Sequence, residues 1–293
     1  PFVTPGTKYV TLGGMIAADI HGKNHYKDGS FRKCVDWIDL ITGNGEELRC
    51  SKFKNTELFE WTMGGMGLTG VILRASIRLK PINSAYIKRQ ILLADDLYQV
   101  IKIFEKSKDI TYRVAWIDCL SKGNKFGRSL VMLGEHAETS EIPYQYRKTP
   151  LKTPKRLKFR IPFNFPSWVL NRYSLKIYNK IYYWQEKYQS RQEFVDVEKF
   201  FYPLDKISGW NKIYGRQGFI QFQCVLPLNA AVIGLNELLS SVSTSDTDCF
   251  LAVLKQFGKQ DGKFSFPMEG YSLALDFPAN KKTLRLLEKL DNI

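Results

Sequence analysis

The sequence predicts an α+β fold built on an antiparallel sheet, and a repeated order of elements is the main reason. Strand, helix, strand and strand follow one another twice. The expected ranges are 86–93, 95–106, 111–118 and 128–135 in the first unit, and 219–226, 229–240, 249–257 and 271–277 in the second. Two such units favour one sheet with two helices on one face. The other face is then free to cover a ligand.

The helix expected at 95–106 is the clearest single element. Leu97, Val100 and Phe104 fall on one helical stripe behind the acidic pair at 95–96, which suits a helix N-terminus. The strands are predicted from runs of alternating apolar side chains.

Strand 219–226 carries the first candidate binding residues. Alternate side chains point to opposite faces of a sheet, so Gln221 and Gln223 share one face. Each amide offers a donor and an acceptor, which suits the hydroxyls of a sugar. An ordinary solvent-facing pair is the alternative interpretation.

Lys255 ends the apolar run 250–254, a position where a lysine needs a partner or an anion. Extension of its amine to solvent at the strand end is the alternative.

The sequence pattern of residues 1–84 predicts a smaller unit that precedes the repeats. Residues 37–42 and 47–50 form a hairpin around a Gly-Asn-Gly turn. Asn55 begins a short helix, and a glycine-rich turn then leads into an alternating strand that Pro81 ends. We therefore expect two domains, residues 1–84 and residues 85–293.

Residues 9–25 hold the most suggestive motif. A short β-type run leads to Gly13-Gly14, where backbone N–H groups can approach a bulky or anionic ligand. His21 and His25, two of the three histidines, follow with Lys23 between them. A strand, a turn and a histidine satisfied in the core form the alternative interpretation.

Net charge is +14, and most of it comes from one insertion between the two repeat units. Residues 147–191 carry twelve basic side chains against one acid, Glu186, and are rich in aromatic residues. Basic and aromatic residues together suit an anionic membrane surface. Single-stranded nucleic acid and a solvated, partly mobile insertion are the alternatives.

The composition of the 293 residues is that of a globular protein. Five scattered cysteines with no C-x-x-C pair indicate reduced thiols, and with three histidines we expect no metal site. No signal segment or membrane-spanning run is visible. We expect a cytoplasmic protein, or one peripheral at the inner membrane.

Several motifs together resemble the vanillyl-alcohol-oxidase (PCMH-type) family of FAD flavoproteins, and within it the branch that oxidises decaprenylphosphoryl-ribose. The resemblance runs along nearly the whole chain and rests on the order and spacing of its pieces. These pieces are Gly6, 11–14, 19–25, 57–59, 64–72, 201–205, 209–211, 214–215, 218–223, 255–258, 265–267 and 276–278.

The resemblance assigns roles to particular residues. Residues 1–84 would be part of the FAD-binding domain and residues 85–293 the substrate domain. The catalytic residues would be His21, which orients the reacting hydroxyl, and Lys23. The non-covalent FAD would be contacted by Gly6, Thr11, Leu12, Gly13, Gly14, Ala18, His21, Gly22, Asn24 and Ile72. The substrate would be contacted by Trp116, Gln221, Gln223, Lys255, Phe257, Ser272 and Ala274.

Three positions depart from the family pattern. Ser272 and Ala274 stand where that pattern carries Asn and Cys, and Phe201 replaces a tyrosine. The pocket keeps its outline but loses an amide, a thiol and a hydroxyl. These departures leave the identity of the substrate undetermined.

The implied activity is oxidation of the 2'-hydroxyl of a polyprenyl-phosphoryl ribose to a ketone, the first half of an epimerisation in cell wall biosynthesis. An NAD-dependent keto-sugar reductase and an anionic membrane surface are the implied partners, and no nucleic acid is expected. In the family, a segment before this sequence cradles the FAD pyrophosphate and a segment after it carries a catalytic lysine. We therefore expect weak FAD binding by residues 1–293 alone. An aldonolactone-oxidase-like flavoprotein acting on a soluble sugar acid, and a non-catalytic lipid- or RNA-binding module, are the alternatives.

Overall fold

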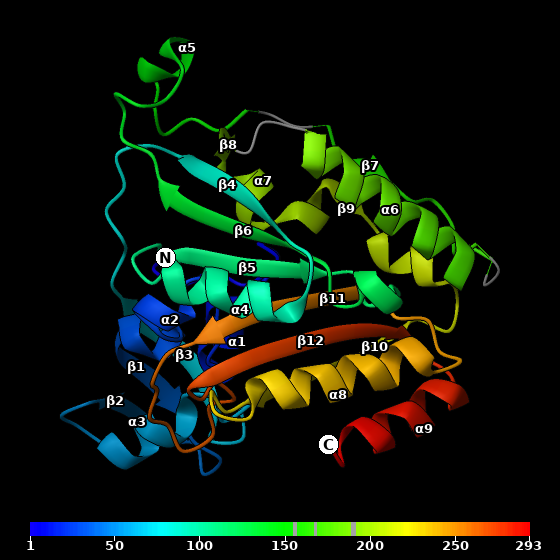
Figure 1. The fold of residues 1–293 in the computed structure, drawn as a ribbon. Coiled ribbons are helices and arrows are strands. Elements are labelled where there is room, and N and C mark those ends of the chain that lie inside the picture. Colours follow the sequence, from blue (N-terminus) through cyan, green and yellow to red (C-terminus); the bar gives the residue numbers. More distant parts are fainter. Residues whose placement is uncertain (155–156, 167–168, 189–191) are drawn as a thin grey trace.

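The structure is a computed structural model that describes residues 1–154, 157–166, 169–188 and 192–293. It confirms the predicted α+β class. A large antiparallel sheet carries helices on both faces, and a smaller sheet lies to one side of it (Figure 1). Lys155, Arg156, Trp168 and Arg191 of the basic insertion lie outside the described residues.

The large sheet has seven strands in the order β10-β12-β11-β5-β6-β4-β8. Every neighbouring pair in it is antiparallel. Six strands come from the two repeat units, and β8 adds an edge. Their bounds are β4 Tyr86–Ala94, β5 Tyr112–Ile117, β6 Ser129–His136, β8 Gln192–Asp196, β10 Phe219–Leu226, β11 Leu251–Phe257 and β12 Gly270–Pro278.

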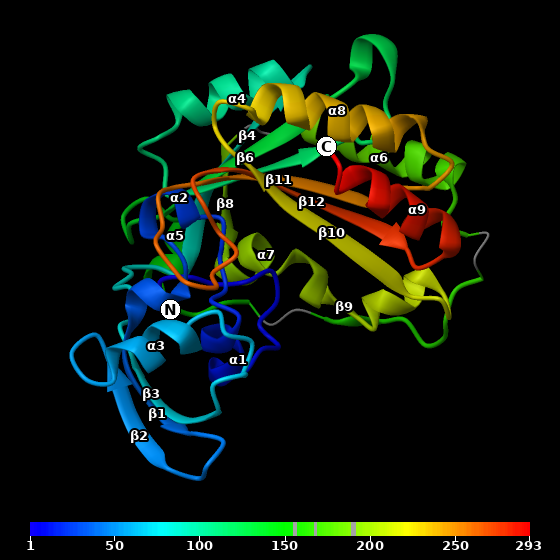
Figure 2. The same cartoon turned by 90° about the horizontal axis from the view of Figure 1, so that it is seen from below.

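Two repeat-unit helices cover one face of this sheet, as predicted. They are α4 (Leu97–Lys106) and α8 (Ala231–Thr244), and α9 (Lys281–Leu290) packs beside α8. Figure 2 shows α4 and α8 on one side of the strands, with α1 and α7 on the other. The largest buried cluster lies under α4, α8 and α9 and includes Phe104, Leu235 and Leu273. Burial of these side chains stabilises the domain and fixes which strand face points away from the helices.

The opposite face of the same sheet is partly covered by α6 (Arg172–Tyr188), the main helix of the basic insertion. Tyr183 of α6 is buried with Ile91, Trp116 and Leu130 of the sheet. The remaining elements are short. They are α5 Tyr144–Arg147, β7 Phe159–Arg160, α7 Val197–Phe201 and β9 Ile207–Ser208, with 3-10 turns at Gly123–Lys125, Pro203–Lys206 and Trp210–Tyr214.

The N-terminal residues form a three-stranded sheet of order β2-β1-β3. The predicted hairpin and strand are confirmed as β1 (Val35–Ile41), β2 (Glu47–Ser51) and β3 (Val71–Ile77). The predicted helix is α3 (Thr56–Thr62), although the Asn55 side chain donates to the Arg49 carbonyl rather than capping it. The other helical pieces are α2 His25–Asp28 and a 3-10 turn at Phe31–Cys34.

The expectation of a strand and turn at Gly13-Gly14 is wrong. Both glycines lie in the helix α1 (Leu12–Ala17), and Thr11 is its N-cap. The Thr11 hydroxyl accepts a hydrogen bond from the Gly14 N–H at 3.1 Å, which satisfies one of the free donors of a helix start. This cap outweighs the weak helix propensity of two glycines.

Candidate functional site

A row of side chains crosses the sheet face that points away from α4 and α8. Strand pairing sets Gln223 opposite Ala274, Ala274 opposite Val253, and Val253 opposite Trp116. Directly paired residues share a face. The adjacent row on the same face pairs Ser272 with Lys255. Sheet register therefore brings together most of the predicted substrate contacts.

His21 of the N-terminal unit lies against this face. The Gln223 side-chain amide donates to His21 Nε2 at 3.2 Å and to the Ser272 hydroxyl at 3.0 Å. Because Nε2 accepts, the ring proton lies on Nδ1. His21 Nδ1 is buried with no hydrogen-bond partner among the described residues.

Aromatic rings hold the His21 imidazole from the side of the β11–β12 loop. Phe257, fully buried at the end of β11, lies edge-on to His21 with ring centroids 4.8 Å apart. Phe266 lies 5.9 Å from the same ring, and His25 lies 4.4 Å from Phe257. Burial, followed by the nearby Lys255 charge, lowers the pKa of His21 well below its usual value. His21 is therefore neutral at physiological pH.

Two lysines make this region electropositive. Burial lowers the pKa of Lys255 to about 8. Burial and then the charge of Lys255 lower the pKa of Lys23 to about 7. The Lys23 ammonium donates to the Phe200 carbonyl at 2.9 Å, whereas Lys255 has no hydrogen-bonding or ionic partner within the described part of the chain. An unpaired, half-buried cation is a candidate position for an anion, because an anionic group would compensate its charge.

The candidate cofactor contacts of α1 lie on its outer side. Thr11, Gly14 and Ala18 are exposed and recur at helical spacing, and Leu12 is half-buried. Gly13 faces Ile72 of β3, since a Cβ added at Gly13 would lie 3.9 Å from the Ile72 Cβ. The structure thus brings Ile72 to the glycine pair.

The other candidate cofactor contacts have mixed surroundings. Gly6 is open, with nothing within 4 Å of an added Cβ. Gly22 is buried, and an added Cβ would lie 2.8 Å from the Thr4 carbonyl oxygen. Asn24 is also buried, and its amide nitrogen donates to the Phe2 carbonyl and to the Asp28 carboxylate. These hydrogen bonds stabilise the segment that carries His21, so Asn24 has a structural role there.

Two predicted substrate contacts lie at the margins of the row. Gln221 is exposed and donates to the Asp276 carboxylate at 2.8 Å. Trp116 is 6 % exposed and packs edge-on against Tyr182 of α6 at 5.1 Å. The basic insertion therefore covers the end of the row that Trp116 occupies.

Sequence reasoning missed a buried carboxylate that joins the two halves of the chain. Asp19, with 0 % exposure, accepts hydrogen bonds from the Ser30 hydroxyl at 2.8 Å and from the Arg32 N–H at 2.8 Å. It also accepts from Gln260 and Ser265 of the β11–β12 loop. Gln260 in turn accepts from His25 and from the Ser30 N–H.

This network fastens the loop carrying Phe266 to the segment carrying His21. The one signal in the sequence was the single acid at position 19 within a run of small and apolar residues. That signal does not indicate which distant residues bind Asp19.

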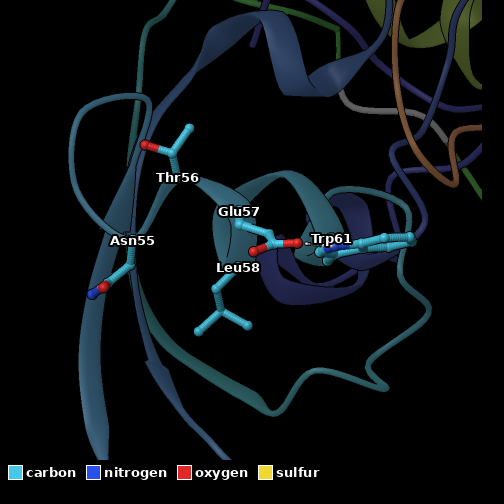
Figure 3. A pocket seen from close by; sticks show the side chains of 5 residues that line it. All are labelled: Asn55, Thr56, Glu57, Leu58 and Trp61. Atoms are coloured by element: carbon cyan, nitrogen blue, oxygen red, sulfur yellow. Dashed lines mark hydrogen bonds between the residues drawn. The ribbon is translucent and has the colours of Figure 1, made fainter.

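A surface pocket lies elsewhere, around α3. It has a volume of about 420 Å³ and is lined by Asn55, Thr56, Glu57, Leu58 and Trp61 (Figure 3). None of these residues belongs to the candidate site. No group of three or more His, Cys, Asp or Glu within the described ranges could hold a metal ion. All five cysteines are free thiols.

No helix in the part of the chain that the structure describes combines the length and apolarity needed to cross a membrane.

Comparisons with known proteins connect this chain to a class of enzyme. The chain is 34 % identical to decaprenylphosphoryl-β-D-ribose oxidase of Mycolicibacterium smegmatis over 293 residues, which cover 99 % of this chain and 63 % of that protein. It is 28 % identical to an uncharacterised protein of Streptomyces coelicolor, over 99 % of this chain and 80 % of the relative. A cytokinin dehydrogenase of Oryza sativa is 39 % identical over 74 residues, 25 % of this chain and 14 % of that enzyme. No family model matches the chain.

The chain is thus a relative of oxidoreductases that bear the names oxidase and dehydrogenase. More particularly, the comparisons confirm the predicted relationship to decaprenylphosphoryl-ribose oxidase-like flavoproteins. The chain spans less than two thirds of the length of the M. smegmatis oxidase. The division at residue 84 and the site roles stay predictions.

Proposed function

We propose that this chain forms the substrate-facing part of an FAD-dependent oxidoreductase that oxidises the 2'-hydroxyl of a polyprenyl-phosphoryl ribose to a ketone. The observation that carries the proposal is the meeting of His21 with Gln223, Ser272 and Lys255 on one sheet face. The whole-chain similarity to a decaprenylphosphoryl-ribose oxidase supports the substrate class.

The residues present fit an FAD at the edge of α1. His21 Nδ1 is a buried donor without a partner among the described residues, and a ligand oxygen would satisfy it. The helix α1 offers Thr11, Gly14 and Ala18 on an exposed surface. FAD, when bound, would supply the acceptor for the hydride that leaves the carbinol carbon. The hydroxyl proton would pass to a general base, which the family resemblance assigns to a lysine in the segment that follows this sequence.

The chain's own side chains would then bind and orient the sugar. Neutral His21 donates from Nδ1 to the reacting hydroxyl, while the Gln223 amide on Nε2 fixes its tautomer. Lys255, together with Lys23, whose pKa is lowered by burial and then by the Lys255 charge, would attract the phosphate of the substrate. Phe257 and Phe266 exclude water from one side of the imidazole.

Turnover of an epimerisation requires a second enzyme. The keto-sugar product must be reduced from the opposite face, so an NAD-dependent keto-sugar reductase is the proposed partner. The aldonolactone-oxidase alternative shares the glycine and histidine features, but it leaves the basic aromatic helix α6 without a role.

The test is anaerobic bleaching of flavin absorbance in the full-length, FAD-loaded protein. Polyprenyl-phosphoryl ribose should bleach the flavin, and the polyprenyl phosphate without sugar should bind without bleaching it. Bleaching by a soluble aldonolactone, but not by the lipid-linked sugar, would replace the proposal with the alternative.

A further inference from the structure

The helix α6 has an outward side that the protein leaves uncovered. Tyr173, Ile177, Ile181, Trp184 and Tyr188 follow one another at steps of four, four, three and four residues. That spacing places them on one helical stripe. Their exposed fractions are 79, 60, 52, 51 and 72 %. An exposed apolar stripe along a whole helix marks an interaction surface.

The inward side of α6 anchors the helix firmly. Leu175, Asn179 and Tyr183 are buried. The Asn179 amide donates to the Asp118 carboxylate at 2.8 Å, and the Arg128 guanidinium lies 4.8 Å from the Tyr183 ring. These contacts fix which side faces out, so the exposed stripe is a consequence of the fold.

Lysines run along one flank of the stripe. Lys176, Lys180 and Lys187 are exposed and recur at helical spacing beside it. The one acid of the helix, Glu186, is half-buried on the anchored side, where burial raises its pKa. The outward half of α6 is thus basic and apolar at once, which is the pattern of a helix lying in a membrane interface.

We propose that α6 docks this protein on an anionic membrane surface, with its axis in the plane of the headgroups. The aliphatic Ile177 and Ile181 occupy the middle of the stripe and insert toward the acyl chains. Tyr173, Trp184 and Tyr188 lie toward its ends and suit the headgroup level. The lysines contact acidic lipid phosphates.

Charge and residue type favour a membrane over two other occupants. A second copy of this chain would bring like-charged lysine flanks together, whereas paired helices use opposite charges beside their seam. Single-stranded nucleic acid would stack on aromatic rings, but the centre of the stripe is aliphatic.

The membrane proposal stands apart from the proposed chemistry, because vesicle binding needs neither FAD nor substrate. It also places the docking surface next to the site. Tyr182 of α6 packs on Trp116, which ends the row that begins at Gln223. A lipid-linked substrate would then meet the enzyme at the membrane that holds it.

The experiment is co-sedimentation of the full chain with vesicles. We expect binding to an equal mixture of phosphatidylcholine and phosphatidylglycerol, weak binding to phosphatidylcholine alone, and loss of binding as salt rises. Lys176→Gln and Lys180→Gln should each weaken binding about fivefold. Ile181→Ser should weaken binding further, and Trp184→Phe should remove most quenching of tryptophan fluorescence by brominated lipid.

Matched controls lie on the opposite side of the molecule. Lys282→Gln on α9 and Ile233→Ser on α8 change exposed residues of the same types and should leave vesicle binding unchanged. Equal binding to both vesicle types, or equal loss in the control variants, would overturn the proposal. So would concentration-dependent dimerisation abolished by Ile181→Ser, or oligonucleotide binding abolished by it while vesicle binding persists.

Discussion

The Gln223 amide donates at once to His21 Nε2 and to the Ser272 hydroxyl, so one side chain fixes the imidazole against the sheet. Replacement by leucine keeps the volume but removes both bonds. We expect Gln223→Leu to slow substrate oxidation about tenfold to a hundredfold, because the His21 ring loses its fixed tautomer and orientation.

Gln221→Leu is the matched control for that variant. Gln221 lies on the same strand and face but is exposed and bonded to Asp276. Steady-state kinetics on both variants should show a much smaller effect for Gln221. Equal losses of oxidation rate in the two variants would contradict a special role for the Gln223–His21 contact.

Asp19 should be among the most sensitive positions for stability. Asp19→Asn keeps the shape of the side chain but turns one acceptor into a donor that faces other donors. We expect the free energy of unfolding to fall by about 2–4 kcal/mol, as for other broken buried networks. Chemical denaturation of the parent and the variant measures this change in the free energy of unfolding.

The control for Asp19 is Asp36→Asn. Asp36 is exposed and pairs with Arg78 at 3.1 Å, so its loss should cost less than about 1 kcal/mol. If Asp19→Asn were as mild as Asp36→Asn, the network would not hold the β11–β12 loop in place.

Lys255 should lower the free energy of unfolding, although it contributes to the binding of an anionic ligand. Its folded-state pKa of about 8 lies below the ordinary value of 10.5, so between these values the unfolded chain binds more protons. The free energy of unfolding attributable to this group therefore rises with pH across that window. Lys255→Met should raise the free energy of unfolding by about 1–2 kcal/mol at neutral pH and flatten that rise.

Phosphate-bearing ligands should bind the same variant more weakly. Lys259→Met, an exposed lysine in the adjoining loop, should change neither property. Denaturation curves at several pH values and ligand titrations provide the readouts. A Lys255→Met protein that is less stable than the parent would show that the ammonium has a partner in the folded state.

Gly258 marks a close approach between the two halves of the chain. A Cβ at this position would lie 2.5 Å from the Tyr26 carbonyl oxygen. Gly258→Ala should therefore cost about 1–3 kcal/mol through forced backbone displacement and weaken ligand binding at Lys255. Gly43→Ala, where nothing lies within 4 Å, is the control, and thermal unfolding compares the two.

Local patterns in the sequence predicted most of the large sheet and its two covering helices. Alternation and helical stripes depend only on neighbouring residues, and each predicted strand of the two units lies within a few residues of its observed bounds. The same alternation placed Gln221 and Gln223 on one face. The register that adds Ser272 and Lys255 depends on pairing between strands far apart in the chain.

The errors and omissions share a physical cause. The start of α1 depends on one cap hydrogen bond, in which the Thr11 hydroxyl accepts from the Gly14 N–H. The two glycines have low helix propensity, so the sequence indicates a turn there instead of a helix. The Asp19 network joins residues 246 positions apart, as in its bond to Ser265. Neither feature leaves a periodic signal, so only the folded chain reveals it.

The most direct test of the account is the rate of anaerobic flavin bleaching by polyprenyl-phosphoryl ribose in the full-length His21→Ala protein. His136→Gln, a change of the third histidine on β6, is the control. We predict a loss of at least about a hundredfold for His21→Ala, with FAD still bound, and little change for His136→Gln. A bleaching rate for His21→Ala within about twofold of the parent rate would contradict the proposed site.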